Sequence, residues 1–117
     1  MRTMNLACSL LLCASSFAVN SAIAEDAPGA SGEELFSFHG CVNCHGADGK
    51  NPVSKLVPVL AGKPADELYT NALKILSGKG GTEESKLMHA AFYSPANCDA
   101  PPTDEQVKAI TAWLATQ

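Results

Sequence analysis

Apolar residues recur at helical spacing in three segments of the chain, and each segment carries a start signal. Residues 31–34 read SGEE, a capping box with a hydroxyl at its start and a carboxylate three residues on. Leu35, Phe36 and Phe38 then give the following turns an apolar side. This pattern predicts a short helix that leads to Cys41.

Two further helices are predicted later in the chain. One begins near Pro64, because the first turn of a helix does not need the N–H that proline lacks, and it ends at the glycine-rich residues 78–81. The other begins at a second capping box, residues 103–106, and runs nearly to the C-terminus. Their apolar positions are Leu68, Ala72, Ile75 and Leu76 in the first, and Val107, Ile110 and Leu114, with Trp113 beside them, in the second.

Between the predicted helices lie two segments punctuated by proline and glycine, at residues 46–63 and 89–102. No alternating pattern typical of a strand accompanies them, so the predicted class is all-α with long loops. Long loops are unusual in so small a chain. They indicate that a large apolar group other than protein fills part of the core.

The first 24 residues have the features of a secretory signal peptide. Arg2 is the only charge before an apolar run at residues 6–19, and the small residues Ala22 and Ala24 stand at the cleavage-defining positions. The run is shorter than the roughly 20 apolar residues of a membrane anchor. We therefore expect cleavage after residue 24, leaving a soluble, periplasmic domain of residues 25–117.

Removing this segment changes the charge and the cysteine count. The remaining chain has seven lysines and no arginine against twelve carboxylates, a formal charge of −5, which argues against nucleic-acid binding. It keeps Cys41, Cys44 and Cys98. Three cysteines cannot all pair, so a cofactor is a better staple than disulfides for a small domain in an oxidising compartment.

Residues 41–46 read CVNCHG, and C-x-x-C-H is the attachment signature of a c-type haem. Two thiols one helical turn apart match the spacing of the haem vinyl groups, and the adjacent histidine then lies under the iron. A structural zinc site needs four ligands, and the usual second ligand pair is missing. A thioredoxin-like dithiol needs a βαβ setting that this pattern lacks.

From residue 31 to the C-terminus the chain resembles the small bacterial mono-haem class I cytochromes c of the periplasm. The matching pieces occur in order: GEELF, CHGADG, PVLAG at residues 58–62, a middle helix with a tyrosine, a methionine, and a terminal helix with Trp113. The resemblance implies a class I cytochrome c fold, three to four helices wrapped around one covalent haem c.

The same resemblance implies roles for individual residues. Cys41 and Cys44 become the thioether cysteines and His45 the proximal iron ligand. The carbonyl of Pro58 accepts a hydrogen bond from the second ring nitrogen of His45, which fixes the ring and its tautomer. Gly32 and Phe36 are expected to meet the terminal helix near Trp113.

The sixth iron ligand is expected to be Met88, the only methionine left after cleavage, in a loop between the last two helices. His89 is the alternative, and ligation by two histidines would lower the reduction potential relative to His/Met. His39 is a poorer candidate, because it is too close in sequence to the iron face that His45 occupies.

A filled coordination sphere implies an electron carrier and not an enzyme. The iron would cycle between Fe(II) and Fe(III) at a moderately positive potential, between a dehydrogenase or quinol-oxidising complex and an oxidase or reductase. Two alternatives stay open: a haem enzyme or gas sensor with an open or displaceable distal site, and the cytochrome subunit of a sulfur-compound dehydrogenase.

Two features bear on transient redox partners. Lys50, Lys55, Lys79 and Lys86 could form a ring around the haem edge, although scattered solubilising charge explains them equally well. The segment 89–102 holds Cys98, which could be a buried inert cysteine, half of an intermolecular disulfide, a redox-sensitive thiol or an alternative iron ligand. Our hypothesis is that this segment is a docking loop and that Cys98 is structural.

Overall fold

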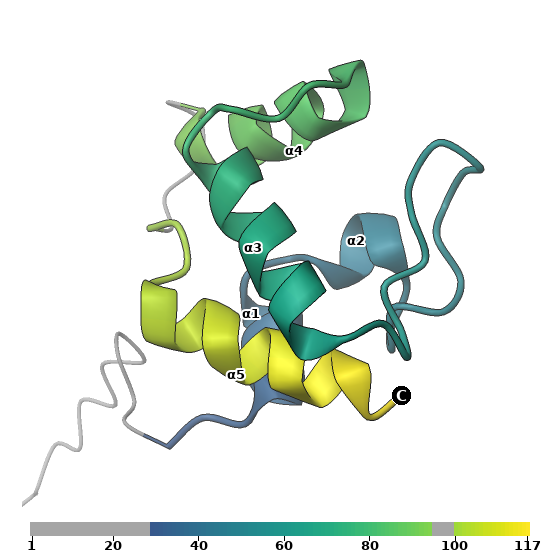
Figure 1. Ribbon diagram of the computed structural model, residues 1–117, viewed down its shortest axis with the longest axis vertical. Helices are drawn as coiled ribbons and strands as arrows, with labels where there is room; N and C mark the ends of the chain where they lie inside the picture. Colours follow the sequence, from purple (N-terminus) through teal and green to yellow (C-terminus); the bar gives the residue numbers. More distant parts are fainter. Residues whose placement is uncertain (1–28, 95–99) are drawn as a thin grey trace, which may run out of the picture.

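A computed structural model describes residues 29–94 and 100–117. These residues contain five α-helices and no strand (Figure 1), so the all-α prediction is confirmed. The helices are α1 (Gly32–Phe38), α2 (Val42–His45), α3 (Ala65–Leu76), α4 (Glu83–Tyr93) and α5 (Asp104–Ala115). The expected signal peptide and Cys98 lie outside the described residues. Within the described part of the chain, no helix combines the length and the apolar character that crossing a bilayer requires.

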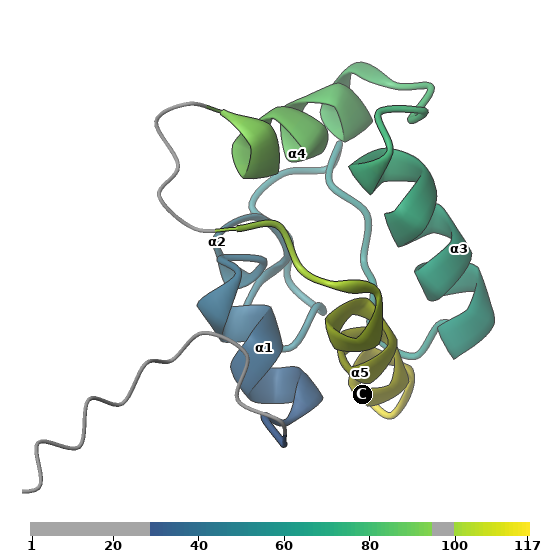
Figure 2. The ribbon, with the colours of Figure 1, turned by 90° about the vertical axis from the view of Figure 1, so that its left-hand side faces the viewer.

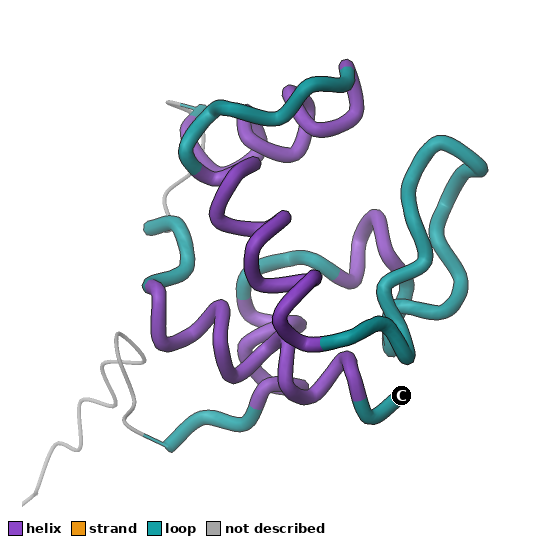
Figure 3. The backbone as a smooth tube through the Cα atoms, viewed as in Figure 1, coloured by secondary structure: helices purple, strands orange, loops and turns teal. Residues whose placement is uncertain are grey.

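The core lies where α1 and α3 pack against α5 (Figures 1 and 3). Its buried side chains come from all three helices: Leu35, Phe36, Leu68, Ile110 and Leu114. The ring centroids of Phe36 and Trp113 lie 5.4 Å apart with an interplanar angle of 49°, a tilted arrangement that aromatic pairs favour. Each such buried side chain stabilises the fold by about 1.5–3 kcal/mol relative to exposure.

Gly32 allows α1 to approach α5 closely. A Cβ atom at this position would lie 2.3 Å from the carbonyl oxygen of Ala109 and 2.5 Å from the Cβ of Trp113. No residue other than glycine fits without moving one helix. The expected contact of Gly32 and Phe36 with the terminal helix near Trp113 is confirmed.

The predicted helix starts agree with the structure. Reciprocal capping boxes join Ser31 to Glu34 and Thr103 to Gln106, and they satisfy backbone N–H groups that have no partner within the helix. Pro64 occupies the N-cap position of α3, one residue before the helix, and α3 ends at Leu76 before the glycine-rich stretch. Three helices therefore begin where their sequence signals are.

The predicted loop at residues 89–102 is wrong for residues 89–93, which belong to α4. Met88 consequently lies within a helix and not in a loop. Helix α4 begins at a capping box between Thr82 and Ser85, in which serine replaces the usual Glu or Gln. With α4 and the short helix α2, the described residues contain five helices, more than the expected three to four.

Helix α4 lies at one end of the molecule. It packs against α3, none of its side chains is fully buried, and Figure 2 shows it at the opposite end of α3 from α5. Among the helices, α4 therefore makes its main contact with α3.

The structure has the predicted loop at residues 46–63. Its base is closed by the carbonyl oxygen of Gly49. The carbonyl of Gly49 accepts from the N–H groups of Leu60, at 2.9 Å, and Ala61, at 3.2 Å. Gly49 has a φ of +74°, and a Cβ there would lie 2.8 Å from Cδ2 of Leu114, so both conformation and space favour glycine. The N–H of Gly62 then donates to Leu114 O at 3.0 Å, which fixes the loop to α5.

Candidate functional site

The CVNCHG motif forms a single helical turn. The N–H of His45 donates to Cys41 O at 3.0 Å, and that of Gly46 donates to Val42 O at 3.1 Å. The turn is attached to the end of α1, because the N–H of Cys41 donates to Phe36 O at 3.1 Å. Cys41 is half-buried and Cys44 is exposed. Two cysteine side chains therefore lie one turn apart, with His45 at the end of the turn.

The two thiols differ in their surroundings. Burial raises the pKa of the Cys41 thiol to about 11, because a thiolate is disfavoured away from water. Cys41 therefore stays protonated at neutral pH. The thiolate, which is the reactive form in exchange reactions, is therefore disfavoured at Cys41.

His45 is buried, with 7% of its surface exposed, and its ring is held by Pro58. Nδ1 lies 3.1 Å from the Pro58 carbonyl oxygen. Since a carbonyl only accepts, Nδ1 carries the hydrogen and Nε2 keeps its lone pair. Burial lowers the pKa of His45, and the weaker effect of the Pro58 carbonyl opposes it. The ring is thus a neutral imidazole, the form that binds metals.

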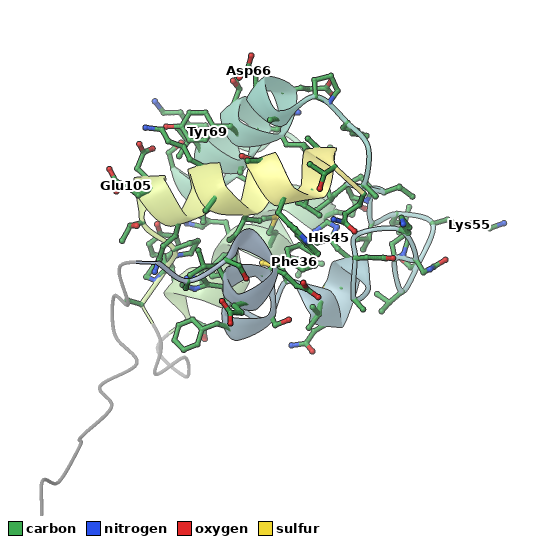
Figure 4. The ribbon with its side chains drawn as sticks, turned by 90° about the horizontal axis from the view of Figure 1, so that it is seen from below. Phe36, His45, Lys55, Asp66, Tyr69 and Glu105 are labelled. Atoms are coloured by element: carbon green, nitrogen blue, oxygen red, sulfur yellow. The ribbon has the colours of Figure 1, made fainter. Side chains whose placement is uncertain are left out.

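The loop brings Pro58 to this position by folding back over α2. The N–H of Val53 donates to Cys44 O at 2.9 Å, so the loop is tied directly to the motif turn. Figure 4 shows His45 within the body of the molecule, whereas Lys55, further along the loop, points outward. The loop therefore has an inner part that orients His45 and an outer part that faces solvent.

Met88 and His89 lie elsewhere, on α4. Met88 is half-buried. His89 is engaged with α3, because its Nδ1 lies 3.1 Å from Ile75 O. His39 lies between α1 and α5, where its Nε2 is 3.0 Å from Oε1 of Gln106. The structure thus brings Cys41, Cys44, His45 and Pro58 together and places the two distal-ligand candidates on a separate helix.

The donor set fits a haem better than a bare metal ion. Among the described residues, no three His, Cys, Asp or Glu side chains gather into a metal site. Two thiols and one neutral imidazole on a single turn match a group that is attached at two points and coordinated at a third. The residues present therefore fit a covalently bound haem.

The lysines expected around the haem edge have different partners. Lys50 forms an ion pair with Asp48 at 3.6 Å, and Lys86 forms one with Glu83. Lys55 and Lys79 have no ion pair within the described part of the chain.

The sequence analysis missed the role of Gly49 in closing the loop. The available signal was a glycine three residues after Gly46, the last residue of the motif.

Two comparisons relate this geometry to known proteins. A sequence model of the family described as Cytochrome c matches residues 29–117, which include all five helices. The cytochrome c-553 of Nitratidesulfovibrio vulgaris (strain DSM 19637 / Miyazaki F) is 30% identical over 105 residues, and the match covers 89% of each chain.

Proposed function

Because this chain belongs to the cytochrome c family, we propose that it carries electrons in the periplasm with an iron that has protein ligands on both haem faces. The family binds haem c covalently, and its activity is electron transfer. The bound haem supplies a reversible one-electron change at its iron. The protein's own residues attach the haem, hold its ligands in place and present its edge to partners.

The observation that carries the proposal is the environment of His45. Its ring is buried and neutral, and Pro58 holds the hydrogen on Nδ1, so Nε2 is the nitrogen available to iron. The thiols of Cys41 and Cys44 lie on the same turn and would form the two thioether bonds. A hydrogen bond at the second ring nitrogen orients the ligand and increases its basicity.

Met88 is the proposed ligand on the opposite face. It is half-buried on α4. The ring of the neighbouring His89 instead lies against the end of α3, where its Nδ1 is 3.1 Å from Ile75 O and its Nε2 is 3.6 Å from the position of a Cβ at Gly78. A thioether ligand raises the reduction potential relative to a second imidazole. With His45 and Met88 both bound, the iron would have no open coordination position for small molecules, as a carrier requires and an enzyme or gas sensor does not.

The loop at residues 46–63 supports transient docking to an acidic partner surface. From Lys50 to Lys63 the sequence has three lysines and no carboxylate, on a chain with a net negative charge. Val53 and Leu56 expose 69% and 71% of their surface on this loop. Exposed apolar side chains beside a local positive charge suit the small, short-lived interfaces of redox partners.

Spectroscopy of the purified holoprotein tests the proposal. We expect the oxidised protein to show a methionine-to-iron charge-transfer band in the near infrared, and the reduced protein to leave its spectrum unchanged under carbon monoxide. Potentiometric titration should give one reversible one-electron step. Ready binding of carbon monoxide would instead indicate an open or displaceable distal site, and the carrier proposal would be wrong.

A further inference from the structure

His89 joins α4 to the C-terminal end of α3. Its Nδ1 donates to the carbonyl oxygen of Ile75 at 3.1 Å, one of the last carbonyls of α3, which have no partner within their own helix. The same oxygen accepts from the N–H of Gly78 at 2.9 Å. The side chain of His89 thus acts as part of the cap of a helix to which it does not belong.

Two further contacts hold the His89 ring. Tyr93, one turn later on α4, stacks on it with ring centroids 4.5 Å apart and an interplanar angle of 27°. Gly78 lies beside the ring, because a Cβ at that glycine would be 3.5 Å from Cε1 and 3.6 Å from Nε2 of His89. The ring is therefore fixed by a carbonyl, an aromatic face and a turn of backbone.

These contacts set the rotation of α4 about its own axis. Consecutive helical residues point about 100° apart, so a fixed direction for His89 determines the directions of Leu87 and Met88. Leu87 exposes 71% of its surface, whereas Met88 and Phe92, which share one side of the helix four residues apart, are half-buried. Met88 therefore points between the solvent side of α4 and the side that faces α3.

We propose that His89 is a positioning residue for Met88: by clamping α4 to the end of α3, it directs the Met88 thioether toward the haem iron. This inference rests on the proposed function, because it takes Met88 as the distal ligand. His89 is well suited to this role because α4 buries none of its own side chains fully. Without the clamp, α4 has no fully buried side chain that would oppose its rotation.

Paired variants of the holoprotein test this role, with imidazole as the competing ligand for oxidised iron. His89→Ala removes both the donor and the stacking ring, while His89→Asn keeps an N–H donor close to the position of Nδ1. We expect His89→Ala to bind imidazole roughly tenfold more tightly and to show a weaker methionine-to-iron band, since one lost hydrogen bond and one lost stack permit that change. His89→Asn restores the donor but not the ring, so we expect it to lie between His89→Ala and the wild type in both properties.

A second pair covers the case in which His89→Ala does not retain haem. Tyr93→Ala removes the stack at the exposed end of α4, and Tyr93→Phe keeps it. We expect Tyr93→Ala to bind imidazole a few-fold more tightly than Tyr93→Phe. Haem content and far-ultraviolet circular dichroism of each variant show that the fold is retained.

The outcomes separate this inference from the proposed function. An unchanged spectrum in Met88→Ala, or ready carbon monoxide binding by the wild type, contradicts Met88 ligation and overturns both. If Met88→Ala changes the spectrum but His89→Ala binds imidazole like the wild type, the positioning role alone is wrong. The same holds if His89→Asn is as impaired as His89→Ala, or if the two Tyr93 variants bind imidazole equally.

Discussion

At the scale of single residues, Gly32 is a position where one added methyl group should lower the stability of the fold. Its missing side chain leaves space for Ala109 O and Trp113 Cβ, which would otherwise lie at 2.3 and 2.5 Å. We expect Gly32→Ala to destabilise the holoprotein by about 1–3 kcal/mol, a typical cost of overpacking. Thermal unfolding followed by circular dichroism measures the change.

Gly81→Ala is the matched control for this prediction. A Cβ at Gly81 meets nothing within 4 Å, so we expect a change within about 0.5 kcal/mol. Equal destabilisation by the two alanines would show that the contact between α1 and α5 is not the cause.

Met88 and its neighbour Leu87 give a second pair at this scale. Met88→Ala should lower the reduction potential and let the reduced protein bind carbon monoxide, because a thioether ligand that favours Fe(II) is lost. Leu87→Ala removes a side chain that is 71% exposed and should change neither property. Potentiometry and carbon monoxide titration measure both; a Leu87 effect as large as that of Met88 would contradict the ligand assignment.

At the scale of helices, a polar cluster joins α3 to α5. The Tyr69 hydroxyl donates to the Asp104 carboxylate, and Nζ of Lys108 lies 3.0 Å from that carboxylate. The Tyr69 hydrogen bond, followed by that of Lys108, lowers the pKa of Asp104 below its ordinary 3.8. A carboxyl with a lowered pKa in the folded state stabilises the fold above pH 3.8, and this contribution is lost as pH falls through the folded-state value.

We therefore expect the wild type to lose more stability on acidification below pH 3.8 than Asp104→Asn, which cannot titrate at this position. Thermal unfolding over a series of pH values measures the difference. Glu105→Gln is the control, since Glu105 is the next residue of the same first turn. If Asp104→Asn and the wild type share one acid profile, the cluster does not contribute to stability.

Sequence predicted the helices that bury side chains in the core and missed α4, which packs against α3 without a fully buried side chain. Helices α1 and α5 carry capping boxes and bury their periodic apolar residues, such as Phe36 and Leu114. In α4 the run from Leu87 to Phe92 has no clear apolar period, because none of its side chains is buried in a protein core. A helix held by contacts along one neighbour, such as that of His89 with Ile75, has little apolar periodicity that sequence analysis could detect.

Some residues of the site could be predicted from the sequence and others could not. Cys41, Cys44 and His45 are adjacent in sequence, so one motif predicts their chemistry. The proximity of Pro58 to His45 came from family resemblance, because it depends on how a long loop folds. The clamp of His89 on Ile75 depends on the packing of two helices, and no local pattern indicates it.

At the scale of the whole molecule, the charge distribution predicts how partners approach. The segment from Lys50 to Lys63 is locally basic on an acidic chain. We expect Lys55→Glu to slow electron transfer to an acidic partner by about two- to tenfold at low ionic strength, and salt to reduce the difference. Stopped-flow measurements over a range of salt concentrations give these rates.

Lys74→Glu makes the same change of charge on α3, outside the loop. It should slow the reaction much less than Lys55→Glu. Equal effects of the two variants would indicate that net charge, and not the loop, determines the rate.

The single backbone oxygen of Gly49 that closes the loop has a consequence for how such proteins diversify. Because the loop is closed at Gly49 by Leu60 and Ala61, and pinned to α5 through Gly62, its outer residues contribute little to the core. Lengthening a closed surface loop costs little, about 0.6 kcal/mol for each doubling. The stretch around Lys55 can therefore change in length and sequence while Pro58 keeps its hold on His45. If the loop docks partners as proposed, partner choice and redox chemistry can evolve separately within one small chain.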